Sequence, residues 1–302
     1  MRQETARKAS YKPVEAAMRV LDVLLAVNTL RDEASVGAIH RKLGLSKPTV
    51  VRMLETLIAA GYVVRDDARH VYRVTGKTIS LASSFDGARE VARLAAPLMS
   101  RFRNSIGWPS DLAIFDADAM LVIGSSRELG PLSFNRAPGY RGPVLTTSLG
   151  LSYCAFCRGE MVDALFERMR GKGALWRGPE EDRERLAARL ENVRRCGFAE
   201  MDPEYSRIAY GNRVSGLAVP VLGSRKVYAA INLIYFKTAL DRDSALLELV
   251  PRLQGIAAQL GALFEEHALD LGDWRCDVPQ TPEMMTPELS EMNAFAGHEG
   301  MP

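Results

Sequence analysis

A tight turn between two amphipathic segments constrains the fold of this chain more than any other feature of its sequence. Residues 44–58 read GLSKPTVVRMLETLI, and their apolar members recur at helical spacing: Val50, Leu54, Leu57 and Ile58. One face of this segment is therefore expected to be buried in a helix. Ser46 is expected to cap the start of the helix, and Gly61 is expected to end it.

The neighbouring residues predict the motif to which this helix belongs. Residues 14–28 predict a first helix with four residues on its buried face: Ala17, Leu21, Leu24 and Leu25. Ser35 is expected to cap a second helix, VGAIHRKL, which ends at Gly44. After the third helix, residues 62–64 and 70–74 predict two strands around a polar turn. The order helix, helix, tight turn, helix and hairpin is that of a winged helix-turn-helix.

Charge sets the first part of the chain apart. Residues 1–77 carry 14 lysines and arginines against 8 acidic residues, a net charge of +6, whereas the remainder carries −4. A small basic module on a mildly acidic body is typical of a polyanion-binding domain attached to a second domain. Many of the basic residues lie in an N-terminal arm (residues 1–12), on the third helix and in the hairpin. Three basic elements around one exposed helix favour DNA binding over a face that is merely solvated.

The third helix follows the tight turn, so its outer face would protrude as a helix does that enters the major groove. Its hydroxyl groups can donate to phosphates, and Arg52 can reach a phosphate or a guanine edge. The hairpin would act as a wing against the flanking backbone of a double-stranded operator. The residues expected to contact DNA are Ser46, Lys47, Thr49, Arg52, Thr56, Arg69 and Arg73.

The whole pattern predicts an α+β protein with several parts. After the basic arm, the winged helix-turn-helix is expected over residues 13–84 and an amphipathic linker helix over residues 85–106. Residues 107–268 contain two predicted hairpins and flanking helices, which indicate an α+β domain. Residues 269–302 are rich in Pro, Glu and Met without periodicity and are expected to be disordered.

The sequence CAFC at residues 154–157 is the strongest competing motif. Two cysteines at this spacing can form a redox pair or half of a zinc site. A zinc site needs four ligands, but Cys196 and Cys276 stand alone and the four histidines are scattered, so no metal is expected. The pattern favours buried structural cysteines. A thiol-based redox sensor or an enzyme that uses Cys154 and Cys157 remains the alternative.

Other chemistry finds little support in the sequence. The chain has no G-x-S-x-G, G-x-x-x-x-G-K or helix-opening G-x-G-x-x-G motif, and Asp116 and Asp118 fall in a predicted turn. We therefore expect no catalytic residue and no cofactor. No run approaches the roughly 18 apolar residues of a membrane span, and the basic N-terminus lacks the apolar stretch of a secretory signal. A cytoplasmic protein that does not enter a membrane is expected.

Four blocks of the sequence resemble the IclR family of bacterial transcription regulators: IHRKLGLSKPTVVRMLETLIAAGYVVRD, GPVLTTSLGLSYCAF, GFAEM and GLAVPV. The similarity covers residues 14–267. Within the family, WPSDLAIFDADAML and LSFNRA look closest to the activator of 3-hydroxyphenylpropionate catabolism and to other regulators of aromatic-acid degradation. The resemblance implies a winged helix-turn-helix, a dimerising linker helix and a GAF-like effector-binding domain. It also implies a homodimer or homotetramer that binds palindromic operators and responds to small organic acids.

The resemblance further implies an effector site lined by Phe134, Gly142, Ser148, Leu149, Asn232 and Ile234. A helix that begins at Ser148 would offer free N–H groups and the positive end of its dipole to a carboxylate. Phe134 would supply an apolar wall for an aromatic ring, and Arg136 and Arg141 are further candidates to pair with the carboxylate. One departure from the family is His40, which stands near the turn in place of a small residue and is expected to alter the crossing of the second and third helices.

Overall fold

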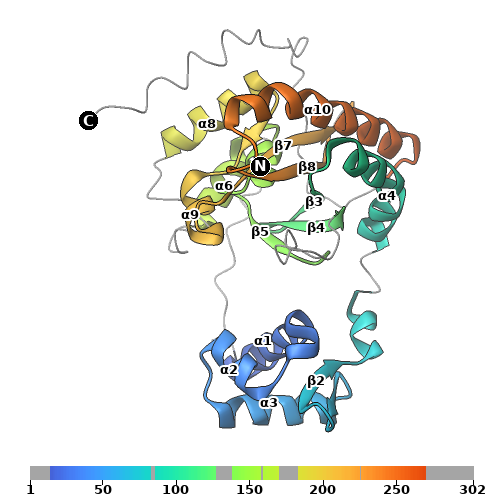
Figure 1. Cartoon of the computed structure of the whole chain (residues 1–302), viewed down its shortest axis with the longest axis vertical. Helices are drawn as coiled ribbons and strands as arrows, with labels where there is room; N and C mark the ends of the chain where they lie inside the picture. Colours follow the sequence, from blue (N-terminus) through green and yellow to red (C-terminus); the bar gives the residue numbers. More distant parts are fainter. Residues whose placement is uncertain are drawn as a thin grey trace, which may run out of the picture. The chain divides into compact units, whose positions relative to one another are not determined.

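The computed structural model describes residues 14–82, 86–126, 138–157, 159–169, 183–224 and 226–269. The chain divides into two compact units, Met1–Asp86 and Gly87–Pro302, whose elements are labelled in Figure 1. The expected mixture of helix and sheet is confirmed. Among the helices of the described ranges, none combines the length and the apolar character needed to cross a membrane.

The first unit has the expected order of elements. It contains α1 (Glu15–Leu30), the 3-10 turn η1 (Arg31–Glu33), α2 (Val36–Leu43), α3 (Lys47–Ala59), β1 (Val63–Asp66), β2 (Val71–Val74) and the 3-10 segment η2 (Gly76–Ala82). Ser35 caps α2, since its Oγ accepts the N–H of Ala38 at 3.2 Å. Gly44 ends α2 in the left-handed conformation, with φ of 68°, as a glycine after a helix commonly does. The winged helix-turn-helix is therefore present, with antiparallel β1 and β2 as its wing.

The predicted buried face of α1 is wrong for three of its four residues. Leu24 is buried, but Ala17 is exposed, and Leu21 and Leu25 are 58% and 63% exposed. The core of the unit instead receives Val23, Leu24, Ala26 and Val27, which pack with α2, α3 and the wing. Apolar residues stand on two sides of α1, so their periodicity could not determine which side faces the core.

The second unit is built on one antiparallel sheet of strand order β5-β4-β3-β8-β7-β6. Its strands are β3 (Ser110–Asp116), β4 (Ala119–Ser125), β5 (Arg141–Pro143), β6 (Ala199–Glu200), β7 (Val214–Leu222) and β8 (Val227–Phe236). The two predicted hairpins are β3–β4 and β7–β8. Between β3 and β4, Ala117 has a φ of 57°, which confirms that the DAD sequence forms a turn.

Helices cover both faces of this sheet (Figure 1). They are α4 (Asp86–Ile106), α5 (Ser148–Ala155), α6 (Gly159–Met169), α8 (Arg183–Cys196), α9 (Pro203–Tyr210) and α10 (Arg242–Glu266). One core cluster joins α4 and α10 to the face that carries Leu112 and Ile114. The other joins α5, α6 and α8 to the face that carries Ala113 and Phe115. The predicted linker helix, α4, is thus packed into the second unit along its apolar side.

Helix α5 is the most enclosed element, because all eight of its residues are buried. Gly150 permits this position: a Cβ there would collide with the backbone carbonyl of Val144. Thr147 caps the helix, since its Oγ1 accepts the N–H of Gly150 at 3.1 Å and donates to the carbonyl of Pro143 at 2.6 Å. The start of α5 is therefore fixed against the strand that precedes it.

One backbone position in the first unit is strained. Arg31, at the junction of α1 and η1, has φ of 49° and ψ of −120°, a region that favours glycine. We expect Arg31→Gly to raise the free energy of unfolding of this unit by about 1 kcal/mol, because the strain relieved exceeds the added entropy of the unfolded chain. Urea unfolding of the full chain measures the change. Arg31→Lys keeps the Cβ and should give no gain; equal stabilities of the three chains would contradict the expectation.

Burial raises the pKa of the Cys154 thiol, in α5, from 9.0 to about 12. The folded state therefore holds this proton more tightly than the unfolded chain does. The resulting stability is complete below the unfolded pKa of 9.0 and is lost as the pH rises toward the folded value of about 12. Between pH 8 and pH 10 we expect the unmodified chain to lose about 1.4 kcal/mol more stability than Cys154→Ala. Urea unfolding at both pH values measures this difference, and equal losses in the two chains would refute it.

Candidate functional site

Helix α3 presents a polar outer face. Its buried side consists of Val50, Met53, Leu54 and Leu57, whereas the predicted Ile58 is 38% exposed. At the N-terminus, Ser46 Oγ accepts the N–H of Thr49 at 3.3 Å and lies 2.8 Å from Thr49 Oγ1. Lys47, Arg52 and Thr56 are exposed on the outer side. Five of the seven residues predicted to contact DNA thus lie on this helix or at its cap.

The hydroxyls of α3 are partly used inside the helix. Thr56 Oγ1 donates to the carbonyl of Arg52 at 2.8 Å, so its hydrogen is already bonded. Thr56 can still accept a hydrogen bond through its oxygen. Within the described residues, Lys47 and Arg52 take part in no ion pair, so both cations are available to a phosphate or a base edge.

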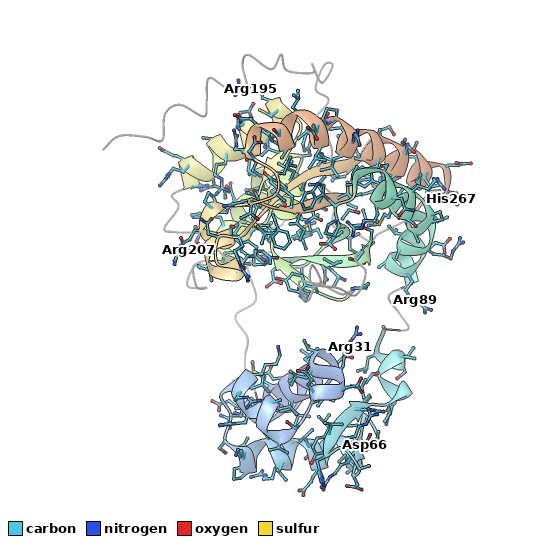
Figure 2. All side chains as sticks on the ribbon, viewed as in Figure 1. Arg31, Asp66, Arg89, Arg195, Arg207 and His267 are labelled. Carbon is cyan, nitrogen blue, oxygen red and sulfur yellow. The ribbon has the colours of Figure 1, made fainter. Side chains whose placement is uncertain are left out.

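The wing places its two predicted contact residues in different surroundings. Arg69 is exposed in the turn, where its backbone N–H donates to Asp66 Oδ1 at 3.2 Å. Arg73 on β2 instead pairs with Asp32 at 3.0 Å and with Asp66 at 3.5 Å; Asp66 is labelled in Figure 2. These carboxylates compensate the charge of Arg73 and connect the wing to η1. A DNA contact by Arg73 stays a prediction. The sequence did not reveal that Arg73 links β2 to η1 through its ion pair with Asp32.

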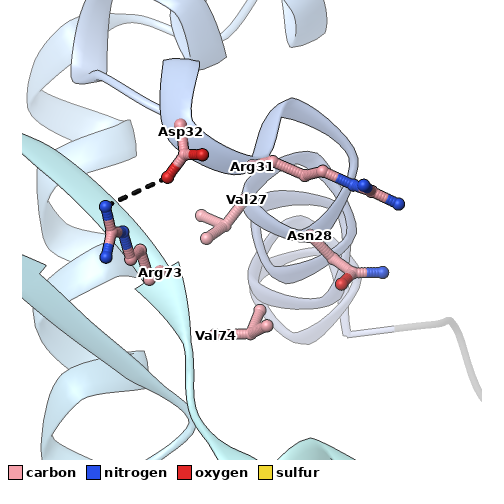
Figure 3. Close-up of a pocket in the computed structure, with 6 residues that line it drawn as sticks. All are labelled: Val27, Asn28, Arg31, Asp32, Arg73 and Val74. Carbon is pink, nitrogen blue, oxygen red and sulfur yellow. Dashed lines mark ion pairs between the residues drawn. The ribbon is translucent and has the colours of Figure 1, made fainter. Parts of the chain in front are cut away.

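The ion pair between Arg73 and Asp32 borders a small pocket between α1, η1 and β2 (Figure 3). Its volume is about 200 Å³, and it is lined by Val27, Asn28, Arg31, Asp32, Arg73 and Val74. Arg73 and Asp32 face each other across one side, and the strained Arg31 stands on another. None of the residues that line the pocket belongs to the predicted ligand site.

His40 closes the turn between α2 and α3. Its Nδ1 lies 2.6 Å from the carbonyl oxygen of Leu45, and because a carbonyl only accepts, Nδ1 carries the proton. The backbone N–H of Gly44 donates to the carbonyl of His40 at 2.9 Å. The residue that departs from the family pattern therefore holds the turn that positions α3. Its effect on the crossing angle of the two helices stays a prediction.

The second candidate site lies at the N-terminus of α5. Ser148 and Leu149 are 1% and 2% exposed, and their backbone N–H groups have no partner within the described residues. Ser148 Oγ is also unpaired, and it is the one such buried side-chain atom in the described part of the chain. A buried hydroxyl without a partner costs about 1–3 kcal/mol. Three donors thus lie at the positive end of the helix dipole without an acceptor among the described residues.

Strand β8 brings further predicted residues to the sheet face that α5 covers. Asn232 and Ile234 alternate with residues of the other core and share their face with Ala230, which packs with α5. Asn232 Oδ1 accepts the N–H of Asp111 at 2.9 Å. Asn232 is 1% exposed, so this hydrogen bond is buried within the sheet.

Two residues that sequence reasoning missed lie near the α5 terminus. The hydroxyls of Tyr140 and Tyr205 are 3.2 Å apart, and a Cβ on Gly142 would lie 3.4 Å from the Tyr140 ring. Asp202 ties α9 to this region, because its N–H donates to the carbonyl of Thr146 at 3.1 Å. The sequence Asp202-Pro203 could have indicated the start of α9, since an N-cap aspartate followed by proline marks a helix start.

The Asp202 carboxylate has several partners. It accepts the N–H groups of Glu204 at 2.9 Å and Tyr205 at 3.1 Å, and it pairs with Arg189 of α8 at 3.0 Å. With a side chain only 7% exposed, this ion pair is shielded from water on the acidic side. Asp202 therefore fixes α9 and α8 relative to the residue before the α5 cap.

The other residues predicted to contact the ligand differ in their location and in their partners. Phe134 and Arg136 lie outside the described residues. Arg141 pairs with Asp118 at 2.8 Å and also with Asp116, so its charge is compensated at the β3–β4 turn. Gly142 is buried in β5 beside the α5 cap. The structure thus brings Gly142, Ser148 and Leu149 close together and places Asn232 and Ile234 on the adjoining sheet face.

Both cysteines of the CAFC motif are buried, and Cys154 is a free thiol. No disulfide therefore joins Cys154 to Cys157. The raised pKa of Cys154 and its complete burial make it a poor nucleophile. In the described ranges, no three His, Cys, Asp or Glu side chains are grouped as metal ligands would be.

Comparison with known proteins places both units in one family. Residues 16–67 match the IclR helix-turn-helix domain, and residues 87–262 match the bacterial transcriptional regulator IclR C-terminal domain. The HTH-type transcriptional regulator KdgR of Escherichia coli is 25% identical over 254 residues, which cover 84% of this chain and 94% of that protein. The Pca regulon regulatory protein of Pseudomonas putida is 26% identical, over 71% of this chain and 72% of its own length.

A solved structure shares the fold over most of the chain. It is an IclR homolog from Microbacterium hydrocarbonoxydans complexed with 4-hydroxybenzoate, with a TM-score of 0.61 and 22% identity. The match covers 83% of this chain and 99% of that one. The second family domain alone spans more than half of the present sequence. The chain is a member of the IclR family of bacterial transcriptional regulators.

Proposed function

We propose that this regulator binds its operator through α3 and the wing, and that a small carboxylic acid bound at the N-terminus of α5 controls that binding. The observation that carries the second part is the buried, unpaired hydroxyl of Ser148 beside two free backbone N–H groups. A carboxylate accepts several hydrogen bonds at once and is favoured by the positive end of a helix. It would complete the bonds that this protein leaves open.

We further propose that the acid is aromatic. The related structure that holds 4-hydroxybenzoate and the related Pca regulon regulator both support this class. The half-buried Tyr140, the buried Tyr205 and the buried Ile234 provide aromatic and apolar surface for such a ligand. The resemblance to the activator of 3-hydroxyphenylpropionate catabolism makes that acid one candidate within the class. The proposal includes a cytoplasmic homo-oligomer with a GAF-like effector domain and no enzymatic activity.

Ser148→Ala provides a test with two opposite effects. Removing the unpaired hydroxyl should raise the free energy of unfolding without ligand by about 1–3 kcal/mol. The same change should weaken binding of an aromatic acid about tenfold, since a hydrogen bond to a charged group is lost. Thermal unfolding with and without 4-hydroxybenzoate, benzoate and 3-hydroxyphenylpropionate measures both effects.

A matched control lies four residues along α5. Ser152 is equally buried, but its Oγ donates to the carbonyl of Leu149 at 3.1 Å. Ser152→Ala should therefore lose stability and keep the affinity for the acid. If Ser148→Ala binds the acid as tightly as the unmodified chain, the carboxylate site is elsewhere. If no acid of this panel shifts the unfolding of the unmodified chain, the aromatic class is wrong.

Arg52→Ala tests the DNA-reading face of α3. Loss of one phosphate or base contact should weaken operator binding by about 1–3 kcal/mol. The measurement is a mobility-shift titration at fixed salt, with a duplex selected from a random library by the unmodified protein. Arg101→Ala, which removes an exposed arginine from α4, is the control for net charge. Equal affinities of the two variants would exclude Arg52 from the interface.

A further inference from the structure

The segment that follows the wing, η2, is attached to the first unit without a buried side chain. None of the residues of η2, Gly76–Ala82, is buried, and Ile79 and Leu81 are 70% and 60% exposed. The apolar core cluster of this unit contains no residue of η2. In the chain, η2 leads to α4, the first helix of the second unit. Some other interaction must therefore hold η2 in place.

Polar bonds attach η2, and they end at the C-terminus of α3. Lys77 Nζ donates to the carbonyl of Ala60, the residue that follows α3, at 2.8 Å. Thr75, just before η2, donates from Oγ1 to the carbonyl of Gly61 at 2.7 Å. The backbone N–H of Thr75 donates to the carbonyl of Tyr62 at 2.9 Å. Three successive carbonyls after α3 thus accept from residues 75 and 77, and we call these bonds the α3–η2 contact.

Two further interactions fix the position of Lys77. Its ammonium lies 4.7 Å from the centre of the Tyr62 ring, within the range of a cation–π interaction. Its backbone N–H donates to Thr75 Oγ1 at 3.2 Å, so the same hydroxyl accepts from Lys77 and donates to Gly61. A cation at the C-terminal end of a helix also interacts favourably with the helix dipole. Thr75 and Lys77 therefore form one network at the end of α3.

The α3–η2 contact lies at the end of α3 opposite to its first predicted DNA contacts. Ser46, Lys47 and Thr49 are at the start of the helix, which spans 13 residues, about 20 Å. A rigid helix that tilts at one end moves its other end. Hydrogen bonds to base edges need close distances and alignment, whereas attraction to phosphates is far less directional. The tilt of α3 should therefore affect sequence reading more than general DNA affinity.

We propose that Lys77 and Thr75 are positioning residues for DNA recognition. The α3–η2 contact holds the C-terminal end of α3 and sets the tilt at which its other end meets the base edges. A displacement of η2 moves α3 through the same bonds, so the segment before α4 can act on the DNA-reading helix. This inference rests on the proposed DNA contact of α3, but on neither the acid nor its site.

Lys77→Met in the full chain tests the role of the cation. Binding to the duplex selected by the unmodified protein should weaken about tenfold, because a hydrogen bond from a charged group is lost. Binding to a shuffled duplex of the same length should stay within about twofold, since a distant exposed charge is screened. The dependence of the affinity on salt should not change, because no phosphate contact is removed. Fluorescence anisotropy with labelled duplexes at several salt concentrations measures all three quantities.

Lys47→Met is the matched control. It removes the same charge from the start of α3, where Lys47 is exposed and a phosphate contact is predicted. It should weaken binding to both duplexes alike and lower the slope of log affinity against log salt by about one. If Lys77→Met behaves in the same way, Lys77 contacts a phosphate and the positioning role is wrong. If Lys77→Met changes binding to neither duplex, the α3–η2 contact does not position α3.

Thr75→Val tests the contact without a change of net charge. Valine has nearly the shape of threonine but cannot donate to the carbonyl of Gly61. We expect a loss of about threefold for the selected duplex and none for the shuffled one, since one neutral hydrogen bond is removed. If the contact only stabilised the folded unit, Thr75→Val and Lys77→Met would affect both duplexes equally. That result would also overturn the proposal.

Lys77→Arg should restore recognition. Its cation can still donate to the Ala60 carbonyl and lie over the Tyr62 ring, so binding to the selected duplex should return to within about twofold of the unmodified chain. Binding as weak as that of Lys77→Met would contradict the proposed contact. Failure of the DNA-reading face itself would appear separately, as unchanged operator binding by Arg52→Ala and Lys47→Met, and would remove the basis of this inference as well.

Discussion

The close approach of α5 to the backbone of Val144 is the constraint on which the proposed ligand site depends. Only glycine at position 150 allows it, because any Cβ there would overlap the Val144 carbonyl. The helix is consequently buried along its whole length, and its first N–H groups open into the interior of the unit. A helix terminus in that position leaves donors that no group of the described residues satisfies. These open donors are the reason why we propose an anion as the ligand of this site.

The first unit depends on a comparable local constraint at its turn. His40 bonds to the carbonyl of Leu45, and Ser46 caps the helix that follows, so the three residues between α2 and α3 have one conformation. Arg73 adds a connection from the wing to η1 through Asp32. The face of α3 that we propose to read DNA is therefore positioned by short-range bonds around its start, while Lys47 and Arg52 on that face take part in no ion pair within the described residues. Because the bonds that position α3 do not involve its outer cations, α3 could contact DNA without breaking those bonds.

Sequence reasoning succeeded where the relevant interaction is local. Ser35, Ser46 and Gly44 act within four residues of their own positions, so helix boundaries could be predicted closely. It failed for α1, because periodicity identifies apolar residues but not which of two apolar sides meets the core. It also missed the Tyr140–Tyr205 pair, whose members are 65 positions apart, and the compensation of Arg73 by Asp32. Such contacts depend on how distant elements meet, and no spacing in the sequence records that.

The sheet itself connects the proposed ligand site to the helix that follows the DNA-binding unit in the chain. Asn232 lies on the α5 face, and its side chain accepts the backbone N–H of Asp111 on the neighbouring strand β3. The next residue, Leu112, points to the opposite face and belongs to the cluster that contains Val91 and Ala95 of α4. A ligand that contacts the side chain of Asn232 would therefore act on a group that already holds β3, one residue from a contact of α4.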